Sequence, residues 1–194
     1  MEKADLIRIL KTDRTVFSFK DILLESSEDS PALLRRRLHH YIQKGELYAI
    51  RRGLYAKAEN YDKFELATKI FTPSYISFET VLARAGMIFQ YYERIFVASY
   101  LSREIICDGQ GYSYKKIKGW VLTNRAGVEH RDYYAIASAE RAFLDIVYLY
   151  KNYYVDNLSP LNWEKVFELV PIYGSKIMVK RVNEYYKHFK SDQA

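Results

Sequence analysis

Cysteine is almost absent from this 194-residue chain, which contains only Cys107. A single cysteine cannot form an internal disulfide or build a zinc site of the common cysteine-rich kinds. The first residues, Met1 to Asp5, lack the apolar segment of a secretory signal, and no apolar run approaches the ~18 residues of a membrane span. We therefore expect a cytoplasmic protein that makes no contact with a membrane.

Sequence signatures of enzymes and of cofactor sites are also missing. The chain contains no G-x-x-x-x-G-K-[ST] phosphate loop, no H-E-x-x-H zinc helix and no nucleophile elbow. His39 and His40 are adjacent, so they diverge by about 100° on a helix and do not form a metal-binding face. Glu140 and Asp145 face different ways and do not form an acid/base pair. We predict that the chain is not an enzyme and binds no cofactor or metal, although an active site assembled from distant residues would leave no such signature.

Acidic residues are nearly missing from one stretch of the chain. Between Ser30 and Lys57, seven basic residues accompany a single acid, Glu46, so this segment carries +6, the net charge of the whole chain. The basic residues are Arg35, Arg36, Arg37, Lys44, Arg51, Arg52 and Lys57. A localised basic segment is typical of a site for a polyanion, and a solvated basic face without function is the alternative.

Three helices are predicted in the N-terminal part. Residues 4–11 carry a helical apolar stripe, and residues 15–17 are extended. Ser18 is a good N-cap for a second helix over 19–25. Ser30 and Pro31 predict the start of a third helix, which runs to Lys44 and is ended by Gly45.

The third helix has two distinct faces. Leu34, Leu38, Tyr41 and Ile42 follow helical spacing and should pack inward. Arginine and glutamine are suited to guanine and adenine edges in a major groove, and flanking basic groups hold phosphates. The residues of this helix that we expect to meet DNA are Ala32, Arg35, Arg36, Arg37, His39, His40, Gln43 and Lys44.

A basic hairpin is predicted directly after this helix. Residues 47–50 and 54–56 form two strands, joined by the tight turn Arg51-Arg52-Gly53, in which Gly53 can adopt a positive φ. Three helices followed by a hairpin with arginines at its tip are typical of a winged helix-turn-helix, and the tip can lie on phosphates or in the minor groove. Arg51, Arg52 and Gly53 therefore complete the predicted DNA interface.

The remainder of the chain predicts a second domain, so we expect a winged helix-turn-helix over 1–59 and an α+β domain over 60–194, with a small antiparallel sheet flanked by helices. Its expected strands lie at 94–98, 104–107, 112–115, 119–122 and 133–136, and its expected helices at 63–71, 78–85 (capped by Ser77), 138–149, 158–170 and from 174 onward. An apolar face on the last helix either pairs two protomers or packs on its own domain. This face contains Met178, Val182, Tyr185, Tyr186 and Phe189.

Three segments resemble one protein family. Gly45-Glu46-Leu47 running into Arg51-Arg52-Gly53-Leu54-Tyr55 resembles the wing of AbiEi-type antitoxins, transcriptional regulators of bacterial abortive-infection toxin–antitoxin operons. Residues 75–82 (YISFETVL) resemble the helix that opens the second domain of that family. Residues 136–145 (IASAERAFLD) resemble its later A-S-P-E-R-A-L-x-D helix, with Ala139 where proline is usual. The resemblance spans about residues 1–150.

The resemblance implies a type IV toxin–antitoxin system. The N-terminal domain would bind operator repeats and repress its own operon, and the second domain would oppose a nucleotidyltransferase toxin without stable binding to it. Because one winged helix reads only a few base pairs, we expect a homodimer on DNA. Two alternatives stay open. One is a ligand- or partner-sensing protein that docks through its winged helix, and the other is an RNA-binding protein that stacks bases on some of its 19 tyrosines.

Overall fold

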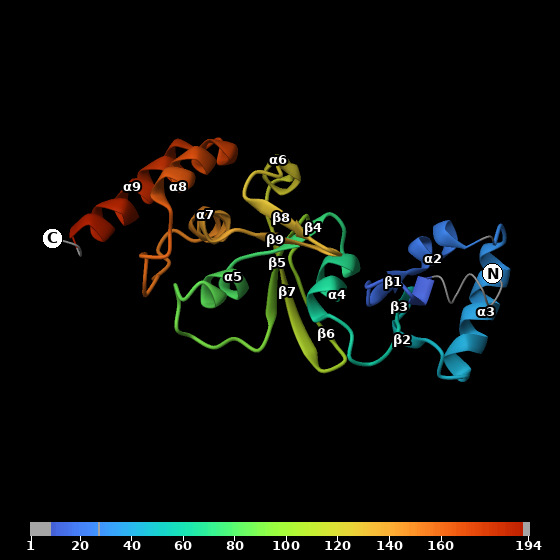
Figure 1. Ribbon diagram of the computed structural model, residues 1–194. Helices are drawn as coiled ribbons and strands as arrows, with labels where there is room; N and C mark the ends of the chain where they lie inside the picture. The colour runs from blue at the N-terminus through green and yellow to red at the C-terminus, as the bar shows by residue number, and fades with distance from the viewer. Residues whose placement is uncertain (1–8, 27, 192–194) are drawn as a thin grey trace. The chain divides into compact units, whose positions relative to one another are not determined.

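The computed structural model describes residues 9–26 and 28–191, and the chain divides into two compact units, Met1–Ile70 and Phe71–Ala194 (Figure 1). The fold is mixed α+β, as predicted, with a three-stranded sheet in the first unit and a six-stranded sheet in the second among the residues described. None of the helices in those ranges is both long and apolar enough to cross a membrane.

The first unit contains three helices and three strands within its described residues. They are β1 (Val16–Ser18), α2 (Phe19–Glu25), α3 (Pro31–Gln43), β2 (Tyr48–Arg51), β3 (Leu54–Ala56) and α4 (Lys63–Ile70). The strand order is β1-β3-β2, and both pairings are antiparallel. The helix predicted over 4–11 lies largely outside the described residues. The predictions of α2, α3 and the hairpin are confirmed to within a residue or two at their ends.

Local capping fixes where α2 and α3 begin. The Ser18 side chain accepts a hydrogen bond from the Asp21 amide, and the Asp21 carboxylate accepts one from the Ser18 amide, so the two form a capping box. Ser30 Oγ accepts from the Leu33 amide, with Pro31 in the first turn. These groups replace hydrogen bonds that the first turn of a helix cannot make internally.

The core of the first unit lies beneath α3. Leu34 and Leu38 are fully buried in one apolar cluster, and Tyr41 and Ile42 pack against it. The inward face predicted for this helix is therefore confirmed. The other buried members of the cluster are Ile9, Phe17, Ile22 and Leu47.

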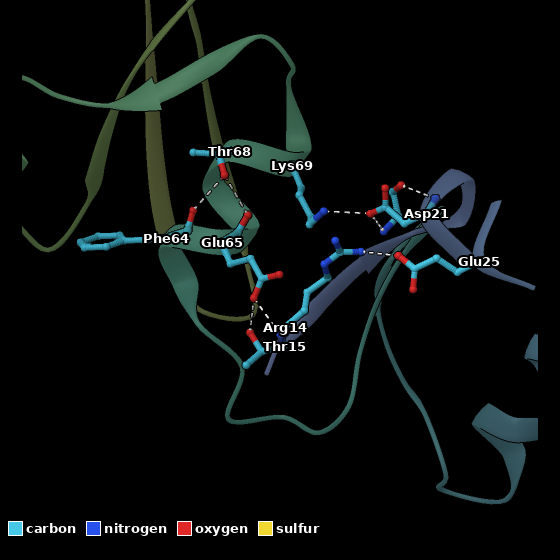
Figure 2. A network of polar contacts seen from close by, with 9 residues as sticks. Arg14, Thr15, Asp21, Glu25, Phe64, Glu65, Thr68 and Lys69 are labelled. Atoms are coloured by element: carbon cyan, nitrogen blue, oxygen red, sulfur yellow. Dashed lines mark hydrogen bonds and ion pairs between the residues drawn. The ribbon is translucent and has the colours of Figure 1, made fainter. Parts of the chain in front are cut away.

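Helix α4 belongs to the first unit, although the sequence analysis placed the domain boundary before it, at residue 59. Figure 2 shows the polar contacts that hold it there. Glu65, only 2% exposed, accepts hydrogen bonds from the Thr15 amide at 2.8 Å and from Thr15 Oγ1 at 2.7 Å. Lys69 forms an ion pair with Asp21 at 2.8 Å. Hydropathy could not reveal this inward-facing carboxylate, because its partner lies 50 residues earlier.

The second unit is built around a six-stranded sheet. Its elements are β4 (Ser74–Ile76), α5 (Glu79–Arg84), β5 (Ile95–Ser99), β6 (Arg103–Cys107), β7 (Gln110–Lys116), α6 (Gly119–Thr123), β8 (Val128–Arg131), β9 (Tyr134–Ala137), α7 (Ala139–Leu149), α8 (Trp163–Leu169), the short 3-10 helix η1 (Val170–Tyr173) and α9 (Lys176–Ser191). The strand order is β6-β7-β5-β4-β9-β8. Helix α7 packs against α5, α8 and α9.

Several predictions for this unit are corrected. The sheet is mixed rather than small and antiparallel, since β4–β9 and β5–β7 are parallel pairs. The segment predicted as a strand over 119–122 is helix α6, and β4 and β8 were not predicted. Parallel strands are brought together by tertiary packing over long sequence separations, so no local pattern marks them.

Two opposite charges are buried side by side in α7. Arg141 and Asp145, both 0% exposed, lie one helical turn apart, with Nε and Oδ1 separated by 3.4 Å. The Arg141 guanidinium donates to the Ala126 carbonyl at 2.8 Å and to the Val121 carbonyl at 2.6 Å. It also donates to the Tyr75 hydroxyl at 3.0 Å. Arg141 thus ties α7 to three other segments.

Three hydroxyl groups converge on the Asp145 carboxylate. Tyr75, Ser77 and Tyr173 donate to it at 2.9, 2.7 and 2.7 Å. Burial raises the pKa of Asp145 above its ordinary value, and Arg141 and the hydroxyl donors oppose that rise. Burial also raises the pKa of both tyrosines well above the ordinary value, so both remain protonated donors at neutral pH. The predicted role of Ser77 as a helix cap is wrong, because Phe78 occupies the N-cap of α5.

Replacing Arg141 with methionine should destabilise the second unit by about 3–5 kcal/mol, because it leaves a buried carboxylate without its counter-charge. Urea unfolding monitored by tryptophan fluorescence measures the stability of this unit specifically, since Trp120 and Trp163 both lie in it. The matched control is Arg141→Met combined with Asp145→Leu, which should be more stable than the single variant. A single variant within about 1 kcal/mol of the native chain would contradict the prediction.

Candidate nucleic-acid interface

The outward face of α3 presents polar and basic side chains to solvent. The exposed members of the predicted set on this helix and its C-cap are Ala32, Arg35, Arg36, His39, His40, Gln43 and Lys44. Most of them lie on the side away from Leu34 and Leu38, which are anchored in the core, and Arg35 flanks that side. Arg37, also predicted, is half-buried. The structure therefore brings most of the predicted helix residues onto one accessible surface.

Two of the three consecutive arginines are tethered. The guanidinium carbon of Arg35 lies 4.7 Å from the ring centroid of Phe19 in α2, a cation–π contact. Arg37 forms an ion pair with Glu28 at 2.7 Å. Glu28 lies just before the basic segment, so sequence reasoning counted Arg37 as uncompensated and missed its partner. The charge available on this face is smaller than the sequence suggested.

A shallow hollow lies along the same side of α3. It has a volume of about 420 Å³ and is lined by Leu33, Arg36, Arg37, His40 and Tyr41. Leu33 was not among the predicted site residues, although it is partly exposed beside Arg36 and Arg37. An apolar side chain within a basic surface can contact the apolar part of a base, such as a thymine methyl group.

The hairpin tip carries the other predicted residues. Arg51 and Arg52 are exposed, and the pairing of β2 with β3 is irregular between Ala49 and Arg51. Gly53 has φ = +78°, as its predicted turn conformation requires. Its carbonyl accepts a hydrogen bond from the Phe19 amide at 2.8 Å. The tip is therefore fixed to the start of α2, a connection that the sequence did not reveal.

The apolar face predicted on the last helix is used within the second unit. Met178 and Val182 are buried, and the Tyr185 ring lies 5.3 Å from that of Phe143. The rings of Tyr186 and Phe189 lie 5.0 and 5.4 Å from that of Trp163. Of the two alternatives for this face, packing on its own domain is confirmed. A pairing of two protomers would therefore need another surface.

Comparison with known proteins gives no family assignment: no protein-family model matches the chain, and no curated protein matches it. Residues 75–82 and 136–145 meet in space within the second unit. Tyr75 and Ser77 come from one segment, Arg141 and Asp145 from the other, and all four join the buried network. These two segments therefore hold the core of the second unit together.

Replacing Gly53 with valine should strain the hairpin tip by about 1–2 kcal/mol, because a β-branched residue rarely adopts a positive φ. Gly53→Asn is the matched control, since asparagine tolerates this conformation and should cost much less. Amide hydrogen exchange of β2 and β3 in the full chain measures the effect at the hairpin. Equal protection in the two variants would show that φ at this position is not limiting.

Proposed function

We propose that this protein is a DNA-binding transcriptional regulator whose first unit acts as a winged helix-turn-helix on duplex DNA. The observation that carries the proposal is the joint exposure of the α3 face and the basic hairpin tip. A 13-residue helix anchored by Leu34 and Leu38 offers its opposite side to a major groove, while Arg51 and Arg52 extend from a neighbouring turn.

The proposed roles of the residues follow from how each is held. Arg36 and Gln43 are exposed and suited to base edges, arginine to guanine and glutamine to adenine. His39 and His40 lie on the same face, and Ala32 near its start allows a close approach of the helix. Arg35 and Arg37, tethered to Phe19 and Glu28, are better suited to phosphates, as are Lys44, Arg51 and Arg52.

Duplex binding should depend strongly on salt. With ~4–6 phosphate contacts per protomer, the logarithm of the binding constant should fall with that of salt concentration at a slope of about −4 to −5. Arg52→Ala should weaken binding to every duplex and reduce the slope by about one unit. Arg36→Ala is the contrasting variant, expected to cost about 1–3 kcal/mol on the operator and to relax sequence preference.

Fluorescence anisotropy with operator and scrambled duplexes across salt concentrations provides the measurement. A flat salt response would contradict the proposal as a whole. Intact sequence preference in Arg36→Ala would contradict only the assignment of this side chain to base reading. Stronger competition by single-stranded RNA than by duplex would favour the RNA-binding alternative.

We further propose that the chain is an autorepressing antitoxin of a type IV abortive-infection system. This proposal is supported by the resemblance of residues 45–55, 75–82 and 136–145 to the AbiEi-type family. The first unit would bind operator repeats, two protomers together, and the second would oppose a nucleotidyltransferase toxin. The two activities would then depend on different residues.

Repression of the promoter and rescue of growth from the toxin should be lost in different variants of the full chain. Arg36→Ala combined with Arg52→Ala should abolish repression of the chain's own promoter, yet still restore growth when the proposed nucleotidyltransferase toxin is induced. A reporter fusion and a growth assay measure the two effects side by side. Arg141→Met, which weakens the second unit, should do the reverse. Loss of both activities together in the arginine variant would contradict the division of labour.

A further inference from the structure

A chain of polar contacts connects α4 to the start of α2. Lys69 Nζ lies 2.8 Å from Asp21 Oδ2, and the same oxygen accepts the Ser18 amide at 2.9 Å (Figure 2). Asp21 therefore serves both as the counter-ion of Lys69 and as half of the capping box of α2. Both side chains of the ion pair are largely shielded, with exposed fractions of 18% for Lys69 and 28% for Asp21.

Phe19, which follows the N-cap residue Ser18, connects these polar contacts to the candidate interface. Phe19 donates its amide to the Gly53 carbonyl at the hairpin tip, and its ring lies under the Arg35 guanidinium. A shift of the first turn of α2 therefore moves both the turn that carries Arg52 and the surface that supports Arg35.

Glu65 fixes helix α4 to the start of strand β1. Its carboxylate accepts the Thr15 amide and hydroxyl directly before β1, and β1 pairs with β3 along Val16–Ala56, Phe17–Tyr55 and Ser18–Leu54. Since β3 is the strand that leaves the hairpin tip, α4 holds the hairpin from two directions. One runs through β1 and the other through the cap of α2.

We propose that Lys69 and Glu65 are positioning residues of the DNA interface, which set the hairpin tip and Arg35 against the phosphate backbone. The inference rests on the proposed function and extends it to a helix outside the predicted DNA-binding domain. The functional unit then ends at Ile70, and residues 60–70 are part of it.

The positioning role differs from a general contribution to stability. Helix α3 has its own cap at Ser30 and its own anchors, Leu34 and Leu38, in the apolar core. Loss of the Lys69–Asp21 pair should therefore disturb Arg35 and Arg52 and leave Arg36 and Lys44 in place. Burial raises the pKa of Asp21, but hydrogen bonds from Lys69 and Ser18 outweigh it and leave the pKa lowered, so this carboxylate stays charged at neutral pH.

Asp21→Ala in the full chain gives a test in which charge and positioning predict opposite signs. Removing a negative charge from a basic protein should strengthen binding to DNA if only overall electrostatics matter. Positioning predicts binding roughly three- to tenfold weaker on a 30-base-pair duplex, the loss of about one phosphate contact. Thermal unfolding of the variant verifies that the chain is folded at the assay temperature.

Lys69→Met supplies a second variant and a double-mutant cycle. Its effect on binding should become smaller in an Arg52→Ala background and largely disappear when Arg35→Ala is added, because Lys69 then has no contact left to position. It should remain in full in a Lys44→Ala background. Lys69→Arg should restore binding to near the native level. The amide NMR signals of residues 51–53 should shift in Lys69→Met and return in Lys69→Arg.

The outcomes separate this inference from the proposed function. If the native chain does not bind the duplex, the proposed function is overturned and this inference with it. If the native chain binds, and Asp21→Ala binds equally well or more tightly, only the positioning role is overturned. If the effects of Lys69→Met and Arg52→Ala on the binding free energy are fully additive, the positioning role is likewise overturned.

Discussion

Arg141 and Asp145 are both removed from water, and each charge is stable there only because the other is adjacent and because polar groups from several segments complete its shell. Taking an unpaired charge into a protein interior costs many kcal/mol, so the segments that supply these groups are held to one arrangement. Strand β4 supplies Tyr75, η1 supplies Tyr173, and the backbone at Val121 and Ala126 closes around the guanidinium. The mixed sheet and its covering helices are thus organised about one turn of α7.

The burial of Arg141 also explains why position 127 is a glycine. Its φ is +71°, and a Cβ atom there would lie 2.9 Å from both Arg141 Cβ and a Leu169 methyl group. A side chain would have to push aside the fully buried Arg141 or the end of α8. Next to it, Ser138 caps α7 and donates its amide to the Gly127 carbonyl at 2.8 Å. The loop before β8 is therefore shaped by the helix that it covers.

What the sequence could predict follows from how local each interaction is. The starts of α2 and α3, the hairpin turn at Gly53 and the inward face of α3 depend on residues a few positions apart, and all are confirmed. Other contacts join residues that no local pattern connects. Packing brings Glu65 to Thr15 and pairs Ile76 with Ile136 in parallel, and the loop before the basic segment supplies Glu28 as the partner of Arg37. The sequence pattern predicted Ser77 as a helix cap and no role for Glu65, because the partner of each side chain lies far along the chain.

The elements that carry the candidate interface were more predictable than the six-stranded sheet, because they are one helix and the hairpin that follows it. The structure adds an ordering among its arginines. Arg35 on Phe19 and Arg37 on Glu28 are already restrained, so they lose less rotamer freedom on meeting a phosphate than an untethered side chain would. Under the proposed function, such preorganisation would favour affinity for any duplex. Under the proposed function, discrimination among sequences then falls to the exposed side chains between and beyond them, Arg36 and Gln43 above all, since direct readout of a base pair requires a group that reaches the base edge.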